Sequence, residues 1–66
     1  MELHKVIKQA RKEYGDTQAV FAKRLGVSRV HYCGVESGNR SVTLELLKKI
    51  DVVTGKQLVI IYIDRV

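Results

Sequence analysis

The sequence predicts a single, mainly α-helical domain of four short helices followed by one C-terminal β-strand. The chain has 66 residues and no proline, no low-complexity stretch and no internal repeat, so residues 1–66 form one domain. Each of four glycines follows a segment of helical character and can end it in the left-handed conformation: Gly15, Gly26, Gly38 and Gly55. The last apolar segment is instead rich in branched and aromatic residues, which favours a strand.

The first predicted helix spans about Leu3 to Tyr14. At about 100° per residue, its apolar face collects Leu3, Val6, Ile7, Ala10 and Tyr14. The opposite face carries Lys5, Lys8 and Lys12, which we interpret as a solvated face and not as a binding site. Arg11 falls at the border of the apolar face and is the basic residue expected to be half-buried.

The second and third helices are predicted from their N-terminal caps. The Thr17 hydroxyl can cap the second helix, and its inward face then consists of Gln18, Phe21, Ala22 and Leu25. Gly26-Val27 forms the turn, and Ser28 caps the third helix, in which Tyr32 and Val35 point inward. The outward face of the third helix is neither clearly polar nor buried, so we predict that it is the contact surface: Arg29, Val30, Cys33 and Gly34.

The fourth helix begins at Thr43 and ends at Gly55, with Leu46, Leu47, Ile50 and Val53 facing inward. The segment from Gln57 to Asp64 is predicted to be a strand, because both of its faces are apolar: Leu58, Ile60 and Tyr62 on one side, and Val59, Ile61 and Ile63 on the other. A lone strand leaves its backbone donors and acceptors unpaired. We therefore expect residues 57–64 to pair with the same segment of a second subunit, which makes the protein a homodimer.

Charge and cysteine content restrict the possible environment and partners. Twelve Lys and Arg residues against seven Asp and Glu residues give a formal charge of +5, which favours a polyanion such as nucleic acid. The single cysteine cannot close an internal disulfide, which suits a reducing cytosol. The longest apolar run, Leu58 to Ile63, is far shorter than the roughly 20 residues of a membrane span, and no signal peptide is recognised. We expect a soluble, cytoplasmic, nucleoid-associated protein with no membrane partner.

Nothing in the sequence predicts catalysis, a metal or a cofactor. His31 and Cys33 lie two residues apart on a helix and point in different directions, and no further Cys or His completes a ligand set. No serine stands beside a histidine and an acid, and there is no phosphate-cradling glycine loop. The protein is therefore not expected to be an enzyme.

Residues 17–38, TQAVFAKRLGVSRVHYCGVESG, resemble the helix-turn-helix of the Cro and phage-repressor family, also called the XRE family. The motif positions are Thr17-Gln18, Phe21-Ala22, Leu25-Gly26-Val27-Ser28 and Val35-Glu36-Ser37-Gly38. With its flanks, the resemblance covers about residues 3–53. The chain departs from the family pattern at Asp16, Tyr32, Gly34 and Val42, and many members carry a base-reading polar side chain where this chain has Gly34.

The resemblance implies a sequence-specific DNA-binding transcription regulator, expected to be a repressor that binds a palindromic operator as a homodimer. The third helix would enter the major groove of double-stranded DNA, with half-sites about 10 base pairs apart. In this interpretation Gln18 and Arg40 contact phosphate, Arg29 bonds guanine or phosphate, and Val30 can touch a thymine methyl group. The full set of predicted DNA-binding residues is Gln18, Ser28, Arg29, Val30, Cys33, Gly34 and Arg40. The resemblance also implies a partly buried structural ion pair between Arg11 and Glu36.

Two alternatives remain open. The tail GKQLVIIYI is similar to the C-terminal strand of the short, HipB-type antitoxin branch of the family, which would make a toxin protein a further partner. An antitoxin of this kind binds DNA in the same way but mainly neutralises its toxin. Alternatively, Gly34 and Cys33 make a protein-interaction module without DNA binding conceivable.

Overall fold

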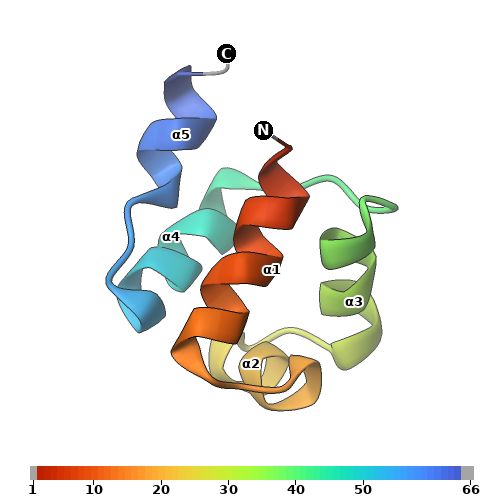
Figure 1. Cartoon of the computed structure of the whole chain (residues 1–66). Coiled ribbons are helices and arrows are strands. Elements are labelled where there is room, and N and C mark those ends of the chain that lie inside the picture. Colours follow the sequence, from red (N-terminus) through yellow and green to blue (C-terminus); the bar gives the residue numbers. More distant parts are fainter. Residues whose placement is uncertain (1, 65–66) are drawn as a thin grey trace.

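Five helices make up the part of the chain that the computed structural model describes, residues 2–64 (Figure 1). They are α1 (Leu3–Tyr14), α2 (Gln18–Leu25), α3 (Arg29–Ser37), α4 (Leu44–Thr54) and α5 (Leu58–Asp64). Helix α1 contacts α3, α4 and α5, while α2 packs against both α3 and α4. The turn between α2 and α3 is the one that the sequence predicts at Gly26-Val27.

Local side chains and glycines set the helix ends as predicted. The hydroxyl oxygens of Thr17, Ser28 and Thr43 accept hydrogen bonds from the third backbone N–H after each of them, at 3.1–3.3 Å. Each cap satisfies one of the donors that a helix N-terminus leaves free. Helices α1 to α4 all end at a glycine with positive φ, and the value of +74° at Gly26 allows the tight turn into α3.

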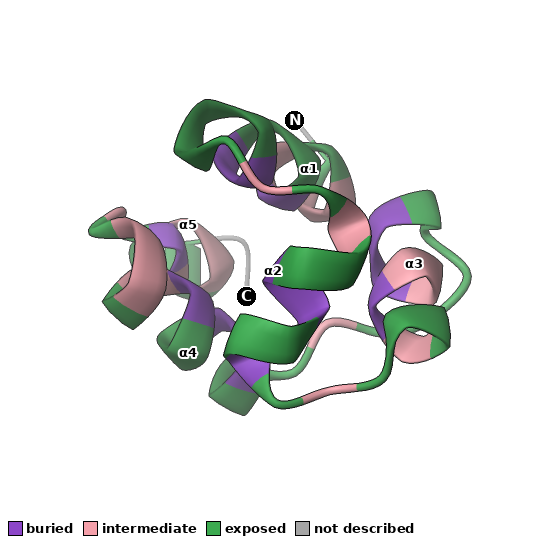
Figure 2. Cartoon of the chain, turned by 90° about the horizontal axis from the view of Figure 1, so that it is seen from below, coloured by how far each residue is buried: buried purple, intermediate pink, exposed green. Residues whose placement is uncertain are grey.

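The core consists of the apolar faces that the helical spacing predicts. Phe21 and Tyr32 are fully buried and meet edge to face, with ring centroids 5.4 Å apart. Figure 2 shows that the buried parts of α1 and α3 are turned toward α2. The predicted inward position of Tyr14 is wrong, because its side chain is 42% exposed and lies under the Arg24 guanidinium, 5.3 Å from the ring centroid.

The predicted C-terminal strand is also wrong. Among residues 2–64 there is no strand, and the segment expected to form one is α5. The Asp51 carboxylate accepts hydrogen bonds from the backbone N–H groups of Leu58 (2.8 Å) and Val59 (3.1 Å), so it satisfies the first free donors of α5. This contact starts a helix where the β-branched composition alone favours extended backbone.

Because α5 is a helix, its buried and exposed residues differ from those that a strand would have. Leu58 is 3% exposed, and three further residues of α5 pack against the same core: Val59, Ile61 and Tyr62. Ile60 is 52% exposed and Ile63 also points outward. Since a helix bonds its own backbone, α5 has no row of free donors and acceptors for a second subunit to pair with.

This helical placement predicts different effects of truncating two neighbouring residues. Leu58→Ala should lower the free energy of unfolding by about 2–5 kcal/mol, because it leaves a cavity in the core. Ile60→Ala should change it by less than about 0.5 kcal/mol, because the side chain is exposed. Urea denaturation of both variants measures these values. Equal losses would contradict the helix, since Leu58 and Ile60 share a face only in a strand.

Candidate nucleic-acid interface

Helix α3 turns one side toward the core and presents the other side to solvent. Tyr32 and Val35 are fully buried and anchor the helix. Arg29 and Val30 in the first turn are exposed, and the Val30 side chain keeps 76% of its accessible surface. Ser28 stands at the N-cap, where its hydroxyl oxygen accepts the His31 N–H at 3.1 Å. The N-terminal half of α3 is therefore a firmly held and exposed edge.

A buried ion pair fixes α3 against α1. The Arg11 Nε donates to Glu36 Oε2 at 2.6 Å, and Arg11 Nη2 donates to Glu36 Oε1 at 3.2 Å. Arg11 Nη1 also donates to the backbone carbonyl of Asp16 at 2.8 Å. The guanidinium and carboxylate thus meet in the two-pronged arrangement that makes such pairs strong and directional.

Gln18 extends this pair to α2 and to the outward side of α3. Its Nε2 donates to Glu36 Oε1 at 3.0 Å, and its Oε1 accepts a hydrogen bond from Cys33 Sγ at 3.1 Å. Since an amide nitrogen carries two hydrogens, Gln18 keeps one donor for a further partner. The continuous chain of contacts from Arg11 through Glu36 and Gln18 to Cys33 ties three helices together.

The charges of the pair stabilise each other. Burial by itself raises the pKa of Glu36, but the interactions that its carboxylate makes, above all the hydrogen bond from Arg11, hold the pKa below its ordinary value. The hydrogen bond to Glu36 in turn raises the pKa of Arg11. Both groups are therefore charged at neutral pH, and the acid on α3 is directed inward.

A shallow hollow on the outward side of α3 brings most of the predicted DNA-binding residues together. Five of the seven line it, namely Gln18, Val30, Cys33, Gly34 and Arg40. Ser28 and Arg29 lie at the N-terminal end of the same helix. Two further lining residues, Ser37 and Asn39, were missed by the sequence analysis. Helical spacing from Val30 and Cys33 is a signal that could have found Ser37, whereas Asn39 depends on the path of the loop.

The cations beside this hollow are free. Neither Arg29 nor Arg40 forms an ion pair with another residue in the described range 2–64. No acidic residue lines the hollow. Unpaired guanidinium groups on an exposed helix face are well suited to bind phosphate oxygens or base edges.

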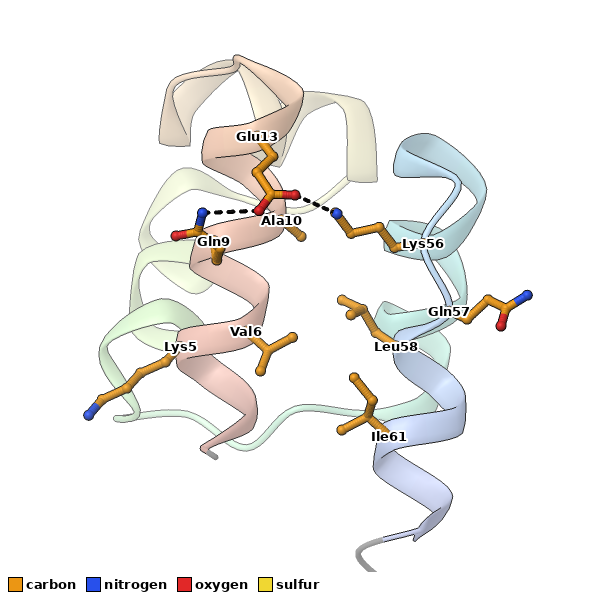
Figure 3. A pocket seen from close by; sticks show the side chains of 9 residues that line it. All are labelled: Lys5, Val6, Gln9, Ala10, Glu13, Lys56, Gln57, Leu58 and Ile61. Carbon is orange, nitrogen blue, oxygen red and sulfur yellow. Dashed lines mark hydrogen bonds and ion pairs between the residues drawn. The ribbon is translucent and has the colours of Figure 1, made fainter.

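A second hollow, between α1 and α5, has a different character. Figure 3 shows Val6, Ala10, Leu58 and Ile61 along its apolar floor. At its rim the Glu13 carboxylate accepts hydrogen bonds from Lys56 Nζ at 2.5 Å and from Gln9 Nε2 at 3.0 Å. Because its main charges are already paired, this surface does not attract a polyanion in the way that the α3 face does.

The described part of the chain holds neither a metal-ligand cluster nor a membrane-spanning helix. Over residues 2–64, no three His, Cys, Asp or Glu side chains gather as metal ligands do. Each helix in that range is too short or too polar to cross a bilayer.

Comparison with known proteins gives one family. The family model described as Helix-turn-helix matches residues 7–61, which run from the first turns of α1 into α5. No curated protein and no solved structure gives a significant match to the chain.

The lowered pKa of Glu36 predicts a pH dependence of stability. The contribution of Glu36 to the free energy of unfolding is fully present above the ordinary carboxyl pKa of 4.5. It is lost as the pH falls through the lower pKa that Glu36 has in the folded protein. Urea denaturation between neutral pH and pH about 3 should show this loss in the native chain, and Glu36→Gln should remove it.

Glu13→Gln is the matched control. The Lys56 and Gln9 hydrogen bonds also lower the pKa of Glu13, but its carboxylate lies at the surface, where water screens it. If Glu13→Gln flattened the acid dependence as much as Glu36→Gln, the buried pair would not be its source.

Proposed function

Since the chain belongs to the XRE-type helix-turn-helix family of DNA-binding transcription regulators, we propose that it is a sequence-specific repressor that binds a palindromic operator as a homodimer. The observation that carries this proposal is the exposed first turn of α3. It presents unpaired Arg29 and uncovered Val30 next to a hollow without an acidic residue. A helix presented in this way fits the major groove of B-form DNA.

The side chains divide into two roles in this proposal. Arg29 bonds the O6 and N7 acceptors of a guanine, and Val30 contacts a thymine methyl group. The free amide hydrogen of Gln18 contacts a phosphate oxygen, and the N-terminus of α3 at Ser28 adds its positive dipole end. The phosphate contacts set the register, and the base contacts set the sequence.

Helix α5 supplies the proposed contact between the two subunits. Ile60 and Ile63 are exposed apolar side chains that a second copy would cover. Leu58, which the sequence analysis assigned to the dimer contact, is committed to the core of its own chain. A two-fold axis through such a contact requires inverted half-sites about one helical turn, 10 base pairs, apart.

A repressor is preferred over an antitoxin because the support for the antitoxin has been removed. That interpretation depended on a C-terminal strand, and residues 58–64 form a helix. No feature of the described residues identifies a toxin-binding surface in its place.

The test is selection of bound sequences from a pool of randomised DNA duplexes, followed by affinity measurements on the selected duplex and its single-base variants. The wild type should select two inverted half-sites. Arg29→Ala should cost about 1–3 kcal/mol of binding free energy on the selected duplex and relax the preference at one base pair per half-site.

Lys49→Ala is the control for loss of a positive charge. Lys49 is exposed on α4, which lies on the opposite side of α2 from α3 (Figure 2). Its removal should leave sequence preference unchanged. Failure of the wild type to select any sequence would contradict the proposed function and favour a protein-interaction module. Selection of a single half-site would contradict the homodimer alone.

A further inference from the structure

The outward face of α3 has a gap at Gly34, and a side chain from outside the helix lies across it. A Cβ atom added to Gly34 would lie 3.0 Å from both Cγ and Cδ of Arg40 and 3.3 Å from its Nε. Contacts this short are tighter than nine in ten contacts that real Cβ atoms make, so the Arg40 stem would have to move by a few tenths of an ångström to admit a side chain at position 34. We infer that Arg40 reads a DNA base from the position that Gly34 leaves empty, an inference that rests on the proposed DNA-binding function.

The loop after α3 holds Arg40 in this place. Gly38 has a φ of +85°, which turns the chain back at the end of the helix. The backbone N–H groups of Asn39 and Arg40 then both donate to the Gly34 carbonyl, at 2.9 and 3.1 Å. These two hydrogen bonds fix the Arg40 backbone beside the Gly34 carbonyl. Only the Arg40 side chain then has to extend across Gly34 to reach the outward face of α3.

The conformation of α3 does not itself require glycine at this position. Gly34 is absent from the glycines with positive φ, so an ordinary residue fits its backbone. Glycine also weakens a helix interior relative to alanine. The structural use of Gly34 is therefore space for the Arg40 stem.

The Arg40 guanidinium is free to bind DNA. It forms no ion pair within residues 2–64, and its neighbours in the hollow, such as Val30 and Cys33, are uncharged. An arginine guanidinium presents paired N–H donors that match the O6 and N7 acceptors of guanine, which a lysine cannot match with a single ammonium group. A contact to phosphate alone, as the family resemblance implies, needs only the positive charge and would not require a glycine beneath the stem.

The experiment uses the duplex selected by the wild type and its full set of single-base variants. Arg40→Lys keeps the charge. At one base pair per half-site, it should reduce the preference for the selected base over its variants by roughly 5- to 150-fold. Gly34→Ala should lose preference at the same base pair, because its Cβ displaces the Arg40 stem, while thermal unfolding shows that the domain still folds. The double variant that carries both Arg40→Lys and Gly34→Ala should lose no more base preference at that base pair than either single variant.

Arg29→Lys is the matched control, and it should relax a different base pair. If Arg40→Lys and Gly34→Ala keep every base preference of the wild type, Arg40 is a phosphate contact and the inference is overturned while the proposed function stands. If Arg40→Ala lowers affinity equally for all duplexes, the inference is also overturned. A wild type without any sequence preference would overturn both.

Discussion

The buried pair of Arg11 and Glu36 is the interaction on which the placement of α3 depends. The side chains keep only 10% and 2% of their accessible surface, so each charge has exchanged water for its partner. Removing water from two charges costs several kcal/mol per ion, which is recovered only when the geometry is good and the remaining donors and acceptors are satisfied. Here the Asp16 carbonyl and the Gln18 amide add two further hydrogen bonds to the pair. A shift of α3 along or around its axis would break these contacts, so the pair selects one orientation for the helix.

That orientation separates two surfaces with different chemistry. Glu36 faces inward, and its negative charge is balanced there by Arg11. The outward side of α3 therefore carries free arginines and no acid. Gln18 links the buried pair to this surface, since the same amide bonds Glu36 on one side and Cys33 on the other. The hollow between α1 and α5 has an apolar floor instead, with Glu13 and Lys56 paired at its rim. The free arginines on the α3 side can therefore attract a polyanion to that face, which is the face proposed to meet DNA.

The features that could be predicted from the sequence are those that depend on neighbouring residues. Thr17 and Ser28 cap the helices that begin directly after them, and Gly26 forms the turn at its own position. The helix bounds therefore follow from local chemistry. The C-terminal segment was mispredicted because its cap comes from Asp51, seven residues before the first helical N–H and on another helix. β-Branched composition is a weak preference that such a contact overrides. The crossing of Arg40 over Gly34 was not predictable for a similar reason, because it depends on how the loop after α3 folds back. Gly34 by itself indicated only a missing side chain.

If Arg11 and Glu36 act as one unit, their substitutions will not be additive in a double-mutant cycle on the free energy of unfolding. Arg11→Met and Glu36→Leu each strand a charge and should each cost about 3–5 kcal/mol if the remaining partner stays buried. The double variant replaces the pair by apolar side chains and should lose far less than the sum of the two single losses. Additive losses would show that the two residues act independently, and would contradict the claim that their pairing holds α3 in place.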